Sequence, residues 1–287
     1  YKDVLGKTVD RQRRGAATGL ASSVAAAFVI VFALILMSGA IERRGLVLAA
    51  LAMAGGLWIG AAALFSTLPE ERDAASGDAP LEALRTGFRR VLGDRQLGWF
   101  ILTRGLLIST ALAPPFMVAL GSDEDGGALG RLGALVLASS LAGLVSGYVW
   151  GRLADRSSRK VLALTALAAT ISLGATVAAD MGGPIGRGWV LPVLLFTLMI
   201  AYQGVRLGRS THLVDMATPE TRATYTAVSN TAIGVLLLFG GLFGVLAEAY
   251  GPRAVLIALG VMAALAVPAA LRLEEVQRAE EGTDAEA

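Results

Sequence analysis

Eight long apolar runs constrain the fold of this chain more than any other feature. Each is close to the 20 residues that a helix needs to cross the roughly 30 Å hydrocarbon core of a bilayer. Charged or glycine-rich segments separate them. The runs are Ala16–Ser38, Leu46–Thr67, Gly98–Leu120, Leu132–Trp150, Val161–Ala179, Trp189–Leu207, Ala223–Ala247 and Ala254–Leu271. We therefore expect an all-α polytopic membrane protein with about eight transmembrane helices.

The composition agrees with a membrane protein and argues against an enzyme. Hydrophobic residues make up 55% of the chain, and its mean hydropathy is +0.63, well above ordinary soluble usage. The chain has no cysteine and a single histidine, His212. The residues that a thiolate nucleophile, a Cys/His zinc site or a His-based catalytic triad usually requires are therefore largely missing. No polar cluster combines a nucleophile, a base and metal ligands. We expect no enzymatic activity, no metal, no cofactor and no nucleic-acid partner.

The placement of lysine and arginine indicates the orientation. Most of the 25 cations lie before the first run, in residues 69–96, in residues 151–160, in residues 206–222 or after the last run. Cytoplasmic loops carry this excess, so we expect both termini of this chain to be cytoplasmic. Arginine greatly outnumbers lysine and Ala, Gly and Leu are frequent, which indicates a bacterial genome rich in GC. The expected location is the inner (plasma) membrane of a bacterium.

The segment from Gly151 to Lys160 lies between two of the runs and reads Gly-Arg-Leu-Ala-Asp-Arg-Ser-Ser-Arg-Lys. Such a segment is expected to form a tight, charged hairpin at the membrane surface. The carboxylate of Asp155 can cap the following helix while the neighbouring arginines compete for it. The alternative is that the cations only hold the turn on the cytoplasmic side.

This segment resembles the G-x-L-A-D-R-x-G-R-[RK] signature of the major facilitator superfamily. The residues that match are Gly151, Leu153, Ala154, Asp155, Arg156, Arg159 and Lys160, whereas Ser158 replaces the usual glycine. The resemblance implies that Gly151, Asp155, Arg156, Arg159 and Lys160 form a conformational switch.

The number of runs on each side of the signature sets a register within that family. A long charged linker precedes the signature by two runs, as the central loop of the family does, and four runs follow the signature. The chain therefore resembles helices five to twelve with the first four of twelve absent. When the first hairpin is aligned with the last hairpin, Arg14 falls at the same position as Arg222, as two related halves would require. The implied parts are a hairpin of the N-terminal lobe (1–68), a cytoplasmic linker with an amphipathic helix (69–96), a six-helix C-terminal lobe (97–272) and a charged, disordered cytoplasmic tail (273–287).

The resemblance implies transport of a small solute by alternating access, by a secondary active transporter or facilitator that is monomeric when full length. The expected partners are the lipid bilayer and the solute, with a proton as a coupling ion. The alternative is a non-transporting membrane sensor or assembly partner built on the same helices. No Asp or Glu lies well inside a run. If protons drive transport, the titrating carboxylate is expected in the absent helices; the alternative is that coupling uses another route.

Polar side chains inside the runs are the candidates for the transport pathway. A mid-helix charge costs about 2.5–3.5 kcal/mol to insert, which makes Arg104 the first candidate, although its side chain could instead extend to the membrane surface. Gln203 and Arg206 lie one turn apart, and Asn230 lies within the seventh run. Each of these three could contact the solute or bond to a neighbouring helix.

The third run carries a local irregularity. Proline has no backbone N–H and clashes with the preceding turn. The pair Pro114-Pro115 is therefore expected to kink or break the outer part of this helix.

Overall fold

A computed structural model gives the structure of the chain for residues 25, 27–35, 38, 43–67, 93–120, 128–154, 156–183, 185, 187–217 and 221–276. Most of these residues are helical and none of them lies in a strand, which confirms the all-α fold. The longer helices are α3 (Arg43–Ser66), α5 (Arg95–Leu106), α6 (Ser109–Leu120), α7 (Ala128–Ala154), α8 (Ser158–Met181), α9 (Val190–Met216), α10 (Arg222–Leu238) and α11 (Gly241–Leu271).

The chain divides into two compact units. The first comprises Tyr1–Ala79 and Gly127–Leu137, and the second comprises Pro80–Gly126 and Ala138–Ala287. The first contains α3, whose apolar side chains are largely exposed, including Leu57, Trp58 and Ile59. The second contains the signature and all four candidate pathway residues, so it is the unit that matters for function.

Five stretches among the described residues are long and apolar enough to cross a membrane. They are Leu48–Ser66, Arg95–Leu120, Ser158–Met181, Val190–Met216 and Thr224–Leu271, and Gly133–Ser146 is a shorter apolar helix. These stretches confirm a multi-pass membrane protein. The first expected run, Ala16–Ser38, lies largely outside the described residues, so the full number of eight stays a prediction.

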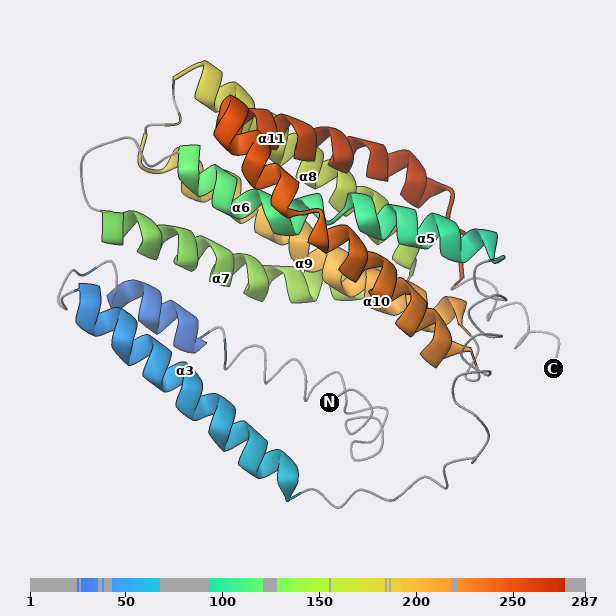
Figure 1. Ribbon diagram of the computed structural model, residues 1–287, viewed down its shortest axis with the longest axis horizontal. Coiled ribbons are helices and arrows are strands. Elements are labelled where there is room, and N and C mark those ends of the chain that lie inside the picture. Colours follow the sequence, from blue (N-terminus) through green and yellow to red (C-terminus); the bar gives the residue numbers. More distant parts are fainter. Residues whose placement is uncertain are drawn as a thin grey trace. The chain divides into compact units, whose positions relative to one another are not determined.

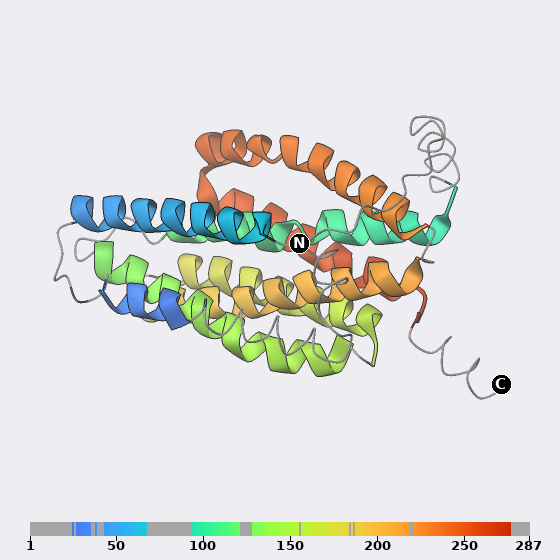
Figure 2. The same cartoon turned by 90° about the horizontal axis from the view of Figure 1, so that it is seen from below.

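The stretch Thr224–Leu271 contains two crossings. Its 48 residues would measure about 72 Å as one straight helix, more than twice the hydrocarbon core. The chain reverses inside α11 at Gly251, whose φ of 81° and ψ of 164° are not helical. Glycine adopts this left-handed φ without the strain of a Cβ, and Pro252 suits the first position of the helix that follows. Figure 2 shows α10 and the first turns of α11 as one run that folds back into the rest of α11.

The two prolines of the third run do not interrupt the helix at their own positions. Pro114 and Pro115 both lie inside α6, and the interruption falls earlier, at Leu107 and Ile108, between α5 and α6. There the N–H of Ile108 donates to the carbonyl of Gly105 at 3.3 Å, a three-residue bond instead of the usual four. A proline ring crowds the carbonyl four residues back, which for Pro114 and Pro115 means Thr110 and Ala111. The interruption at Leu107 and Ile108 lies before these positions, so the expectation that the prolines break the helix was wrong about its place.

The second unit is packed around α8, which contacts both α9 and α11 extensively (Figure 1). Glycines on α9 allow the close approach to α8, as small residues commonly do between membrane helices. A Cβ added at Gly208 would lie 3.0 Å from a methyl carbon of Val161. The main buried cluster consists of Leu97, Phe100, Leu107, Leu162, Ala163, Ala166, Val205, Leu213, Val228, Ala266, Ala270 and Leu273. This core fixes the start of α5, the start of α8 and the end of α11 together at one end of the unit.

Candidate functional site

The signature turn, residues 151–160, is the tight hairpin that the sequence predicts. Gly151 lies in the last turn of α7, which ends at Ala154, and α8 begins at Ser158. The backbone N–H of Arg156 donates to the carbonyl of Leu153 at 3.2 Å. The turn therefore connects the end of α7 directly to the start of α8.

The helix cap expected from Asp155 is made by another residue. The Ser157 hydroxyl oxygen accepts from the backbone N–H of Lys160 at 3.1 Å and is the N-cap of α8. The expectation for the cap was wrong because the first residue of α8 is Ser158, so that Ser157 and not Asp155 occupies the capping position. Asp155 itself lies outside the described residues, so its part in a latch stays a prediction.

Arg159 connects the signature turn to the segment that follows α11. Its Nη1 donates to the carbonyl of Leu273 at 3.3 Å, and its Nη2 lies 3.3 Å from Oε2 of Glu275. The Glu275 side chain is 14% exposed and that of Arg159 is 30% exposed, so water screens the pair only in part. The signature thus forms an ion pair with a residue that the sequence placed in the tail.

The start of the expected tail is packed on the second unit. Leu273 is buried in the main core cluster, and Glu274 exchanges two hydrogen bonds with Gln96 of α5, at 2.9 and 3.1 Å. Residues 277–287 lie outside the described residues. The expectation of a disordered tail from residue 273 was wrong for its first residues, because Leu273 extends the apolar face of α11 into the core.

Sequence reasoning missed the role of the single histidine. His212 is fully buried on α9, its Nδ1 lies 2.9 Å from the hydroxyl of Ser158, and its ring stacks on Phe100 with centroids 5.5 Å apart. Ser158 is the residue that departs from the family signature. A hydroxyl at this position supplies a hydrogen-bond partner for His212, which explains how a serine is accommodated.

Two pairs of candidate pathway residues come together. Nη1 of Arg104 on α5 donates to the hydroxyl of Ser229 at 2.6 Å, and its Nη2 donates to Oδ1 of Asn230 at 2.8 Å, both on α10. Nη1 of Arg206 donates to Oε1 of Gln203 at 3.2 Å, one turn apart on α9. Asn230 thus bonds a neighbouring helix, one of its two expected roles. Ser229 is a further polar residue of this group that the sequence did not single out.

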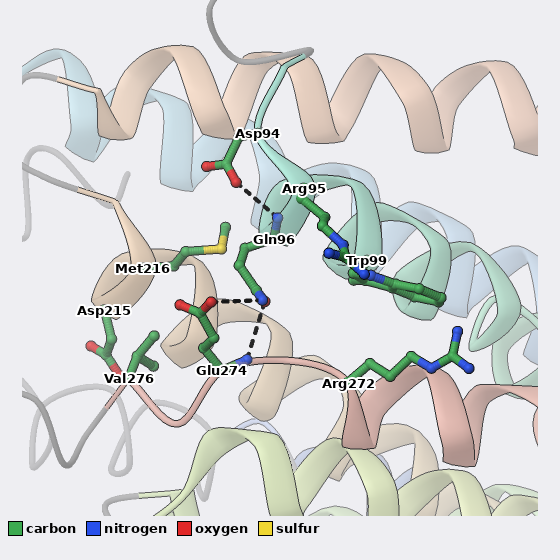
Figure 3. Close-up of a pocket in the computed structure, with 9 residues that line it drawn as sticks. All are labelled: Asp94, Arg95, Gln96, Trp99, Asp215, Met216, Arg272, Glu274 and Val276. Carbon is green, nitrogen blue, oxygen red and sulfur yellow. Dashed lines mark hydrogen bonds between the residues drawn. The ribbon is translucent and has the colours of Figure 1, made fainter.

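A pocket of about 980 Å³ opens at the end of the unit that carries the signature (Figure 3). Side chains from the start of α5, the end of α9 and the segment after α11 line it. In the figure Gln96 points toward Glu274, and Arg272 extends beside Trp99, with its guanidinium carbon 4.6 Å from the ring centroid. The lining residues are Asp94, Arg95, Gln96, Trp99, Asp215, Met216, Arg272, Glu274 and Val276. None of the four candidate pathway residues is among them, so the pocket is a surface feature of the helix ends and not the candidate pathway.

Comparison with known families decides the identity. The family profile described as Major Facilitator Superfamily matches residues 107–287, well over half of the chain. The chain belongs to the major facilitator superfamily. A search of curated proteins found no match. The matched part includes the signature turn and the Arg159–Glu275 pair, whereas Arg104 lies just before it. Members of the superfamily are transporters, so this chain is a multi-pass transporter that works in a lipid environment on a small solute.

Proposed function

We propose that the protein moves its solute by alternating access, as a secondary active transporter or facilitator, with the signature turn as its conformational switch. The observation that carries this proposal is the contact between Arg159 and the segment after α11. Alternating access requires contacts at one membrane face that form in one state and break in the other. A partly exposed ion pair suits that role, because its net free energy is small enough to be reversed during a cycle.

The register proposed for the chain is helices five to twelve of a twelve-helix transporter. In this register residues 1–68 belong to the N-terminal lobe, 69–96 link the lobes, 97–272 form the C-terminal lobe and 273–287 form the tail. Four helices would then be encoded upstream. Transport assays should therefore use the coding sequence extended upstream, and the coupling proton would act on a carboxylate in those helices.

The proposed orientation places the signature in the cytoplasm of a bacterium, with the outer end of α8 facing away from it. The chain has no cysteine, so single cysteines report their positions without background. Lys160→Cys and Met181→Cys mark the two ends of α8, and both positions are exposed. We expect an impermeant thiol reagent to label Lys160→Cys only in inverted vesicles and Met181→Cys only in right-side-out vesicles. Labelling of both from the same side would contradict the membrane crossing by α8.

Asp155→Asn tests the proposed switch. The substitution removes the charge of the signature carboxylate and keeps its size. We expect transport by the upstream-extended protein in proteoliposomes to fall about tenfold, the effect of roughly 1.4 kcal/mol, while the amount of inserted protein is unchanged.

The control for Asp155→Asn is Asp180→Asn, which removes a carboxylate at the opposite end of α8. Asp180 forms an ion pair with Arg253, so its loss can lower stability without altering the switch. Normal transport by Asp155→Asn would reject the proposed role of the signature. Absence of transport by the unsubstituted protein for every solute tested would favour the sensor or assembly alternative.

A further inference from the structure

Three arginines lie at similar depth in the second unit. The start of α5, the end of α9 and the segment after α11 meet around one pocket, which defines one end of the unit. At 1.5 Å per helical residue, Arg104, Arg206 and Arg209 lie roughly 10–15 Å from that end. Asn230, measured from the start of α10, lies at about 12 Å by the same rise. Arg104 therefore shares a level with the two arginines of α9.

The two arginines of α9 lie on the face that does not pack against α8. Tyr202, Arg206 and Arg209 recur at helical spacing on one face, whereas Ala201, Gly204, Val205, Gly208 and His212 on the other face are buried. Arg206 is exposed, and Arg209 is partly exposed. A lipid-facing position is unfavourable for an arginine, and at the centre of a spanning helix it would cost about 2.5–3.5 kcal/mol. This face is therefore expected to border a water-filled path.

The positive charges of this group are not balanced within the part of the chain that the structure describes. Arg209 acts on Arg104, and Arg206 acts on Arg209, as like charges. Their neighbours Ser229, Asn230 and Gln203 are neutral. The ion pairs in the described ranges involve other cations, Arg159 and Arg253.

One nitrogen of the group has no partner of its own. Nε of Arg104 is buried and makes no hydrogen bond to any described residue. A buried donor left unsatisfied costs about 1–3 kcal/mol, and more when the group is charged. An anion that accepts from the guanidinium groups would remove both this cost and the mutual repulsion.

We propose that Arg104, Arg206 and Arg209 form an anion-binding site on the transport pathway, so that the solute carries a carboxylate, a phosphate or a similar oxyanion. The planar guanidinium presents paired donors that match two oxygens of such a group. Asn230 and Ser229 hold the Arg104 side chain in place through its two terminal nitrogens. This inference rests on the proposed transport function and adds the substrate class to it.

The test measures the local potential with charged thiol reagents. The variant Tyr202→Cys places a single thiol on the face that carries Arg206 and Arg209. Its reaction rate with anionic sulfonatoethyl methanethiosulfonate is compared with that for cationic trimethylammonioethyl methanethiosulfonate. Each rate is divided by the rate of the same reagent with Met181→Cys, a position at the end of α8 that is remote from the signature turn. We expect the normalised preference for the anionic reagent to be about tenfold or more, since a cleft of one charge sign concentrates counter-ions by that order.

Arginine substitutions identify the source of the preference. Arg104→Gln and Arg209→Gln in the Tyr202→Cys background are each expected to reduce it at least threefold, and the pair to abolish it. Arg187→Gln, which removes a cation outside the group, is the matched control and should leave it unchanged. Equal normalised rates, a preference that survives the double substitution, or no reaction with either reagent would each overturn the proposal.

A final comparison separates a soluble solute from a lipid headgroup. At constant ionic strength in phosphatidylcholine vesicles, inorganic phosphate or succinate is expected to slow the anionic reagent at Tyr202→Cys. Slowing by neither ion, or slowing only when phosphatidylglycerol is added to the vesicles, would overturn the assignment to a solute. The assay reads charge and not transport, so absence of transport would count against the proposed function alone.

Discussion

Gly204→Ala is expected to destabilise the second unit by about 3 kcal/mol, at the upper end of the usual cost of overpacking a core. The added Cβ would lie 2.3 Å from Cγ2 of Thr165 and 2.7 Å from Cε2 of Trp150. Non-bonded carbon atoms essentially never approach so closely, so one of the neighbours must move. The contact joins α9 to α8 and to the last turns of α7, which together support the signature turn.

Neither neighbour can yield without a further loss. The Trp150 indole N–H donates to the carbonyl of Ile200 at 2.8 Å, so rotation of the ring would break this partly buried hydrogen bond. The hydroxyl of Thr165 donates to the carbonyl of Leu162 at 3.0 Å, and the Thr165 side chain is fully buried. The overlap must then be relieved by separating α8 from α9, which opens the core cluster.

The measurement is the midpoint of thermal unfolding in detergent, followed by circular dichroism. Gly174→Ala is the matched control, because Gly174 also lies inside a helix and a Cβ there meets nothing within 4 Å. Alanine lowers the conformational entropy of the unfolded chain, so this control should be neutral or gain up to about 1 kcal/mol. Equal midpoints for Gly204→Ala and the unsubstituted protein would show that the two helices are less tightly packed than described.

Properties that depend on neighbouring residues could be predicted from the sequence. The helices follow from run length and composition, and the hairpin at 151–160 follows from a charged interval too short for any other connection. The reversal at Gly251-Pro252 coincides with the turn expected between the last two runs, because glycine and proline determine backbone geometry locally.

The contacts of the candidate site could not be predicted in the same way. Arg104 could be singled out because a charge inside an apolar run is costly, but its partners Ser229 and Asn230 lie about 125 residues further along the chain. Glu275 looked like one more charge in a polar tail, and only the burial of Leu273 beside it brings it to Arg159. Pairings between distant elements depend on helix packing, which hydrophobic periodicity does not specify.

Reversing the charge of either member of the Arg159–Glu275 pair is expected to reduce transport about tenfold or more, because repulsion replaces attraction at a contact that water screens only in part. Arg159→Glu and Glu275→Arg each place two like charges together, whereas the double substitution restores opposite charges. We expect the double variant to recover much of the lost rate, and the recovery measures the coupling between the two sites. Arg95→Glu is the matched control, since Arg95 is an exposed cation at the start of α5, and it should change the rate less than twofold.

A crosslink distinguishes a moving contact from one that merely supports the fold. In the double variant Arg159→Cys/Glu275→Cys, a bifunctional thiol reagent can join the two positions without other cysteines interfering. If the contact must open in each cycle, the crosslinked protein will stop transporting while its unfolding midpoint stays the same or rises, and a reducible linker will restore the rate when it is cleaved. Full transport by the crosslinked protein would mean that the contact persists throughout the cycle. The signature arginine would then stabilise the helix ends and the switch would have to lie elsewhere in the turn.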